Sequence, residues 1–185
     1  MNIKAKIEEH ENAVCAIKEN CIPVIEQMGR ICRTALRNGN KILLCGNGGS
    51  AADSQHIAAE FVGRFVKERC GLPSIALTTD TSILTAVGND YGYDEVFRRQ
   101  VEALGISGDV IIGISTSGNS TNVVKAFEEA KKQEMYVLAF TGEKESKMSK
   151  IADVTLQVPS PVTARVQECH ILAGHLICDY IDEVY

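Results

Sequence analysis

Five short runs of apolar residues alternate with longer amphipathic stretches along most of the chain. The runs are KILLC (41–45), SIALT (74–78), DVIIGI (109–114), MYVLAF (135–140) and DVTLQV (153–158). Runs of this length are typical of strands that are buried on both faces of a parallel sheet. Helical periodicity predicts helices at 50–66, 81–104, 120–133 and 163–184, with a short turn near 146–150. The alternation predicts a doubly wound, three-layer α/β sandwich around a five-stranded parallel sheet.

Two further helices precede the sheet. Apolar residues recur at helical spacing between Ile3 and Leu36, and Pro23 stands near the start of the second helix. No repeat, low-complexity tract or linker indicates a second domain. We therefore expect one domain over 1–185, with N-terminal helices in residues 1–38 and the α/β core in residues 41–185.

Composition excludes several classes of function. The formal net charge is -5 and the lysines and arginines are scattered, whereas nucleic-acid binders carry a basic stripe. We find neither a signal-peptide pattern nor an apolar run long enough to span a bilayer, so we expect no nucleic-acid or membrane partner. The seven cysteines are odd in number and form no CxxC pair, which indicates reduced, mostly buried thiols. We expect a cytoplasmic protein.

The first predicted strand is followed by the glycine-rich turn GNGGS (46–50). Glycines let the backbone turn sharply and approach a ligand, and free amides at a helix N-terminus favour an anion. We interpret Ser50 as the N-cap of the next helix, with Asp53 completing a capping box. The turn predicts a phosphate site, although a tight strand-to-helix turn without a ligand has the same features.

The third predicted strand is followed by STSGNS (115–120). The hydroxyl groups of Ser115, Thr116, Ser117 and Ser120 are more than one helix cap needs. Because ligands of parallel sheets bind beyond the carboxyl ends of the strands, we expect both donor-rich turns at one edge. Since neither turn contains a lysine, a sugar phosphate fits better than a nucleoside triphosphate with its magnesium.

His56 and Glu60 are four residues apart on one face of the helix after GNGGS, about 6 Å apart along its axis. The neighbouring Ile57 and Phe61 define an apolar face, so we expect the pair to border the core. A surface contact worth roughly a few tenths of a kcal/mol is the alternative. The position of the pair just after a candidate phosphate turn favours a functional role.

The last predicted helix carries Gln167, His170 and His175 among apolar residues. A single histidine in such a helix is more often a hydrogen-bonded core or surface residue than a catalyst, and we interpret His170 in this way. Gln167 and His175 are eight residues apart, about 12 Å along a straight helix.

GNGGS and GISTSGNS, within the alternating α/β pattern, resemble a sugar isomerase (SIS) domain. Three longer segments narrow the resemblance to the phosphoheptose isomerases, and it spans nearly the whole chain. The segments are CGNGGSAADSQHIAAEFVGRF (45–65), TAVGNDYGYDEVF (85–97) and ARVQECHILAGHLICDYID (164–182).

The resemblance implies that His56, Glu60, Gln167 and His175 hold a divalent metal, usually zinc, one per subunit. Two imidazoles, a carboxylate and an amide oxygen suit a borderline-hard ion. Gln167 and His175 reach one metal only if it lies between them or if another chain contributes, so we expect the site at or near a subunit interface. The resemblance also implies a homo-oligomer, a tetramer, that the N-terminal helices help to bundle.

The implied reaction interconverts sedoheptulose 7-phosphate and D-glycero-D-manno-heptose 7-phosphate through an enediol, the first step of bacterial ADP/GDP-heptose biosynthesis. Glu60 then moves the carbon-bound proton, His175 serves the oxygens, and the metal polarises the carbonyl. The implied substrate-binding residues are Asn47, Gly48, Gly49, Ser50, Glu60, Asn89, Asp90, Ser115, Thr116, Ser117, Ser120 and Gln167.

Three positions qualify the resemblance. Asn89 and Asp90 match sugar-contacting positions of the family, although GND is also a plausible turn before a helix at 94. Some family members carry an acidic residue where this chain has Ala164, so any acid–base role of that carboxylate is absent here.

Two other functions compete with this interpretation. One is a non-catalytic SIS protein that regulates replication by binding the initiator; that branch is expected to lack the acid–base residues, which this chain keeps as Glu60 and His175. The other is a SIS isomerase for a hexose or pentose phosphate. Pocket size, which separates these sugars, cannot be read from the residues.

Overall fold

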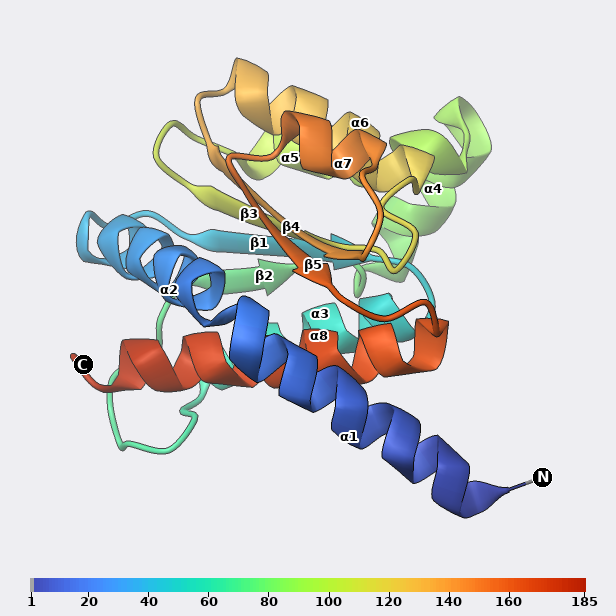
Figure 1. Cartoon of the computed structure of the whole chain (residues 1–185). Coiled ribbons are helices and arrows are strands. Elements are labelled where there is room, and N and C mark those ends of the chain that lie inside the picture. Colours follow the sequence, from blue (N-terminus) through green and yellow to red (C-terminus); the bar gives the residue numbers. More distant parts are fainter. Residues whose placement is uncertain (1) are drawn as a thin grey trace.

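The computed structural model describes residues 2–185 and contains one five-stranded parallel sheet with the order β2-β1-β3-β4-β5. Figure 1 shows the strands between two layers of helices. In β1 the side chains of Ile42 and Leu44 enter the core on one face, and Leu43 enters the core on the other. The predicted sandwich and its five strands are therefore confirmed. The strands are β1 (Ile42–Gly46), β2 (Ser74–Ala76), β3 (Val110–Ile114), β4 (Tyr136–Gly142) and β5 (Val154–Val158).

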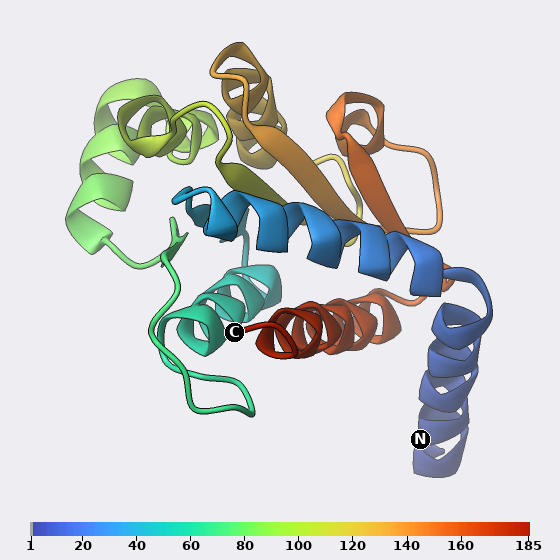
Figure 2. The same ribbon diagram turned by 90° about the vertical axis from the view of Figure 1, so that its left-hand side faces the viewer.

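Helices cover both faces of the sheet (Figures 1 and 2). One layer consists of α1 (Ile3–Asn20), α2 (Ile22–Arg37), α3 (Gly49–Val62) and α8 (Thr163–Asp182). The opposite layer consists of α4 (Thr81–Tyr91), the 3-10 turn η1 (Tyr93–Glu95), α5 (Arg98–Leu104), α6 (Thr121–Lys132) and α7 (Lys147–Ile151). In Figure 2, α1 lies at one side of the molecule; it contacts α8, and Ala13 and Ile17 are its buried residues.

Two predicted helices were too long. The stretch 81–104 is divided because Gly92 adopts a φ of 90°, which a helix cannot contain and which costs glycine little. The helix predicted over 50–66 ends at Val62, and residues 63–73 form a loop that leads into β2. Both errors follow from apolar periodicity that continues past the point where the backbone turns.

The seven cysteines are all free, and five of them are buried, as expected; Cys15 and Cys70 are exposed. Among residues 2–185, none of the helices combines the length and apolar character that crossing a bilayer requires.

A buried ion pair joins the ends of α3 and α8. The Arg69 and Asp182 side chains are 1% and 2% exposed, with Nε of Arg69 2.6 Å from Oδ1 of Asp182. The guanidinium also donates to the carbonyl oxygens of Glu60 (3.0 Å) and Phe61 (2.9 Å) in the last turn of α3. The second Asp182 oxygen accepts from the amides of Val66 (2.7 Å) and Lys67 (3.0 Å). This clamp ties the 63–73 loop to both helices.

Removing one partner of this clamp strands a buried charge. We expect Arg69→Met to lower the free energy of unfolding by roughly 3–5 kcal/mol, measured by urea denaturation at fixed protein concentration. Arg64→Met is the matched control, because Arg64 pairs with Glu68 at an exposed surface and such pairs contribute about 0–1 kcal/mol. Equal losses in the two variants would show that the clamp is no more stabilising than a surface contact.

Candidate active site

The two donor-rich turns meet at one edge of the sheet. The strand order reverses between β1 and β3, so the crevice between their carboxyl ends is where a doubly wound sheet binds ligands. The Asn47 and Asn122 side chains span this crevice with reciprocal amide hydrogen bonds of 2.9 Å each. This pair holds GNGGS against the start of α6.

GNGGS starts α3 differently from the sequence prediction. The helix begins at Gly49 with Gly48 as its N-cap residue, and no side chain caps it. Ser50 therefore lies inside the first turn, so the predicted capping box is wrong. The reason is that the glycine turn enters the helix two residues early, which turns Asp53 away from the helix end and toward α8. No side chain caps the first-turn amides, and those of Ser50 and Ala51 donate to the carbonyl oxygens of Asn47 and Gly48 at 3.1 Å each. The positive end of the helix dipole at this turn still favours an anion.

STSGNS brings three hydroxyl groups together. Ser115 Oγ lies 2.9 Å from Ser120 Oγ and 3.3 Å from Ser117 Oγ, and Ser120 makes no side-chain cap to α6. Thr116 and Ser117 line a polar pocket that also includes Gly142, Ser160 and Thr163, among others. These hydroxyls do not cap α6, and they lie at the edge of the sheet where a ligand would bind.

His56, Glu60 and His175 form a cluster between α3 and α8. His56 Nε2 lies 3.1 Å from Glu60 Oε1 and 3.3 Å from His175 Nε2. The helices approach closely because α8 has Gly174 at the crossing: a Cβ there would lie 2.7 Å from Cγ1 of Ile57. The expected position beside the core holds for Glu60, whose side chain is 24% exposed, and is wrong for His56, which is 51% exposed.

The chemistry of the cluster fits a divalent metal. One donor atom from each of His56, Glu60 and His175 lies within 4.8 Å of the others. Zinc bonds of about 2.0–2.1 Å in a tetrahedron place ligand atoms about 3.4 Å apart, close to the two short distances in the cluster. Two facing imidazole nitrogens are also a natural pair of lone-pair donors.

Gln167 lies on α8 before His175 and contacts α3 at Asp53, nearer the start of both helices. Its Nε2 is 3.3 Å from both carboxylate oxygens of Asp53, and its amide packs on Gly49, where a Cβ would lie 2.9 Å from Oε1. Asp53 is 7% exposed, and burial raises its pKa against the opposing influences of Gln167 and nearby His56. Sequence reasoning missed Asp53 as a site residue, although its spacing from His56 and Glu60 places all three on one face of α3.

Asn89 and Asp90 lie away from this arrangement in the single chain. Both are exposed near the end of α4, and the Asn89 amide donates to Asp90 Oδ1 at 2.8 Å. No hydrogen bond between described residues connects them to the cluster or to either turn. They belong to a helix end and not to a turn before a helix at 94.

His170 is a core residue, as predicted. It is fully buried, its Nε2 donates to the Thr141 carbonyl oxygen at 3.1 Å, and its Nδ1 has no partner among residues 2–185. Burial lowers its pKa to about 4, although the hydrogen bond to Thr141 acts in the opposite direction. The ring is therefore neutral at physiological pH.

Comparisons with known proteins identify the family of this chain. The sequence model of the SIS domain matches residues 7–142, which makes the chain a SIS-domain protein. A phosphoheptose isomerase from Aliarcobacter butzleri is 56% identical over 94% of this chain and 92% of its own. One from Aquifex aeolicus is 53% identical over 98% and 95% of the two chains. The solved phosphoheptose isomerase from Neisseria gonorrhoeae superposes with a TM-score of 0.94 at 48% identity, over 98% and 97% of the two chains.

The chain belongs to the phosphoheptose isomerases, the aldose–ketose isomerases of the SIS-domain family. This membership favours an enzyme over the regulatory alternative.

The buried neutral His170 predicts a pH dependence of stability. The unfolded chain binds a proton at this ring below pH 6.5 and the folded protein only below about pH 4, so stability falls as pH falls through that window. The loss reaches roughly 3 kcal/mol. We expect His170→Gln, which keeps a donor for Thr141, to show a shallower fall in unfolding free energy between pH 6.5 and 4. Parallel curves for the two proteins would contradict this account.

Proposed function

We propose that this protein interconverts sedoheptulose 7-phosphate and D-glycero-D-manno-heptose 7-phosphate, the entry step of bacterial heptose nucleotide synthesis. The observation that carries the proposal is the cluster of His56, Glu60 and His175 between α3 and α8, in a chain that belongs to the phosphoheptose isomerases. An isomerase of this kind moves one proton between neighbouring carbons and another between their oxygens, so it needs a base and an acid on the reacting atoms.

The two turns hold the sugar phosphate in this proposal. The N-terminus of α3 carries no side-chain cap, so its helix dipole favours an anion there, and the hydroxyls of Ser117 and Ser120 each lie within 3.3 Å of the Ser115 hydroxyl. A phosphate accepts from both kinds of group, and the net charge of -5 elsewhere does not compete with such local donors. Further proposed sugar contacts are Asn47, Ser50, Asn89, Asp90, Thr116 and Gln167.

Glu60 is the proposed base. From the ketose, its carboxylate removes a proton from C1 while O2 gains a proton, which gives the enediol. O1 then loses its proton and C2 receives one from Glu60, so the proton count balances. Glu60 Oε1 faces His56, whereas no described residue donates to Oε2, which leaves that oxygen free for the carbon-bound proton. His175 is the proposed acid and base for O1 and O2.

His56, Glu60 and His175, with Gln167, are the proposed ligands of one zinc ion per subunit. Such an ion supplies Lewis acidity that polarises the carbonyl and stabilises negative charge on its oxygen. The protein residues bind the sugar, orient its first two carbons and move the protons.

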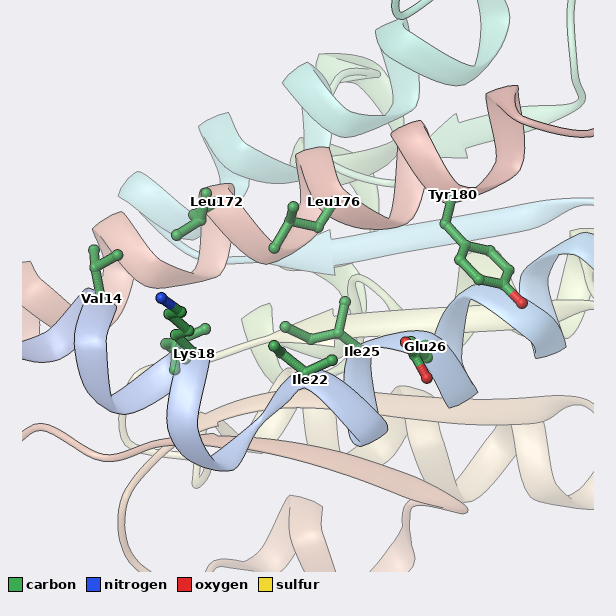
Figure 3. Close-up of a pocket in the computed structure, with 9 residues that line it drawn as sticks. Val14, Lys18, Ile22, Ile25, Glu26, Leu172, Leu176 and Tyr180 are labelled. Carbon is green, nitrogen blue, oxygen red and sulfur yellow. The ribbon is translucent and has the colours of Figure 1, made fainter.

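The assembly is proposed to be a homotetramer in the cytoplasm. Seven free thiols suit a reducing compartment. An apolar groove lies between α1, α2 and α8 (Figure 3), with Ile22 46% and Leu176 41% exposed. Lys18 and Glu26 are the charged residues that line it. Apolar surface of this kind on three helices fits the packing of a second copy.

Nuclear magnetic resonance tests the reaction. We expect purified, zinc-loaded protein to convert sedoheptulose 7-phosphate to the aldose and to exchange the C1 and C2 protons with solvent. Glu60→Gln should lower kcat by about 10²–10⁴-fold and remove this exchange, because an amide cannot accept the proton. Glu68→Gln is the matched control, since Glu68 is 89% exposed in the following loop. Undiminished exchange in Glu60→Gln would exclude Glu60 as the base.

Light scattering after size-exclusion chromatography tests the assembly. We expect the double variant Ile22→Glu, Leu176→Glu to yield smaller species than the wild-type protein, because burying two carboxylates in an apolar interface is unfavourable. Ile106→Glu is the control, because Ile106 is 56% exposed in the loop before β3. An unchanged mass in the double variant would show that the groove is not the contact between copies.

A further inference from the structure

Asp53 is a buried carboxylate that forms no ion pair with any lysine or arginine among the described residues. It is 7% exposed, and the nearby His56 acts on it without a hydrogen bond. Its hydrogen bonds come from one neutral amide, with Gln167 Nε2 3.3 Å from both oxygens. A buried carboxylate held this weakly costs stability. Asp182, by contrast, is also buried (1% exposed) but is matched by a guanidinium and two backbone amides. Asp53 therefore calls for an explanation other than stability.

The hydrogen-bonding chemistry of a carboxylate supplies an explanation for the buried Asp53. An ionised carboxylate only accepts hydrogen bonds, whereas an amide such as Gln167 can present either its oxygen or its NH₂ group. Facing Asp53, Gln167 must turn its NH₂ group inward. Among residues 2–185, none donates a hydrogen bond to Gln167 Oε1. This oxygen is also not one of the fully buried atoms that lack a partner, so it is accessible. The carboxylate thus selects one of two amide orientations and leaves the oxygen open to a ligand.

Gly49 restricts the same amide from the other side. A Cβ at this position would lie 2.8 Å from Nε2, 2.9 Å from Cδ and 2.9 Å from Oε1 of Gln167. The amide therefore lies flat against the first turn of α3. Asp53 sets which end of the amide faces outward, and the space at Gly49 sets where the amide lies.

We propose that Asp53 is a positioning residue that fixes the Gln167 amide with its oxygen, and not its nitrogen, directed to the bound ligand. This inference rests on the proposed function, in which Gln167 contributes to the zinc site beside His56 and His175. Asp53 does not belong to the His56, Glu60 and His175 cluster itself. Its effect on the metal passes through the amide, as is usual for residues that orient metal ligands.

Two other roles predict different behaviour. A purely structural Asp53 would lower the stability of the metal-free protein when replaced. A purely electrostatic Asp53 would attract the cation through its charge, with or without Gln167. A positioning role predicts that the effect of Asp53 on metal binding requires Gln167 and does not require any loss of stability.

A double-mutant cycle separates the three roles. Zinc affinity of the metal-free protein is measured by competition with a chromophoric chelator, for the wild type, Asp53→Asn, Gln167→Leu and the double variant. We expect Asp53→Asn to weaken zinc binding by about 10–100-fold, because an asparagine lets the Gln167 amide turn over. In the Gln167→Leu background, the same change should have little further effect.

The thermal midpoint of each metal-free protein is recorded alongside. We expect Asp53→Asn to match or exceed the wild type, since the substitution removes a poorly compensated buried charge. Glu128→Gln is the matched control for charge, because Glu128 is exposed on α6, across the sheet from the site. It should leave both zinc affinity and the thermal midpoint unchanged.

The outcomes are distinguishable from a failure of the proposed function. If the wild type binds no zinc, the proposed metal site is wrong and this inference falls with it. If the wild type binds zinc but Asp53→Asn binds it equally well, the inference alone is overturned. Equal losses of affinity with and without Gln167 would establish a direct charge effect, and a lowered thermal midpoint would establish a structural role. Either of these results also overturns the inference.

Discussion

The close approach of α3 and α8 is the constraint on which the site depends. Gly174 has no side chain to separate the helices, so Ile57 packs directly on the α8 backbone. Because two helices that cross at one point also lie close on either side of it, the same approach brings His56 to His175 and Asp53 to Gln167. A side chain at Gly174 would push these pairs apart together. The packing at Gly174 therefore sets the distances between the polar side chains of the site.

Asp182 and Asp53 are both buried in this helix pair, but their surroundings differ. Asp182 is surrounded by donors and holds the ends of the helices and the 63–73 loop in place. Asp53 has a single neutral partner, which is poor for stability and informative about function. The clamp lies at the C-terminal end of the helix pair, and Asp53 lies near the N-terminal end. Preorganised sites commonly depend on such a division between supporting and reacting groups.

The other part of the candidate site lies at the carboxyl ends of the strands. Reversal of strand order between β1 and β3 opens the crevice that Asn47 and Asn122 bridge, and the serine hydroxyls gather beside it. In the proposed function, the phosphate binds at this crevice and the metal binds between α3 and α8. Asn89 and Asp90 remain exposed on α4, apart from both halves in the single chain. Together with the apolar groove in Figure 3, this is consistent with the proposal that neighbouring copies complete the surface around the site.

The sequence by itself determined the sandwich, its five strands and the two turns, because alternation of apolar runs and glycine-rich turns reflects local backbone preferences and burial. It also placed His56 and Glu60 on one helix face and marked His170 as a core residue. It misjudged the start of α3 and the length of two helices, because periodicity continues through residues such as Gly92 whose backbone turns. Only the tertiary structure decided that Asp53 faces Gln167 and that His175 meets His56, because these contacts join residues more than 110 positions apart. Contacts between distant residues depend on how closely two helices pack, and that distance is set by the whole core and not by either segment alone.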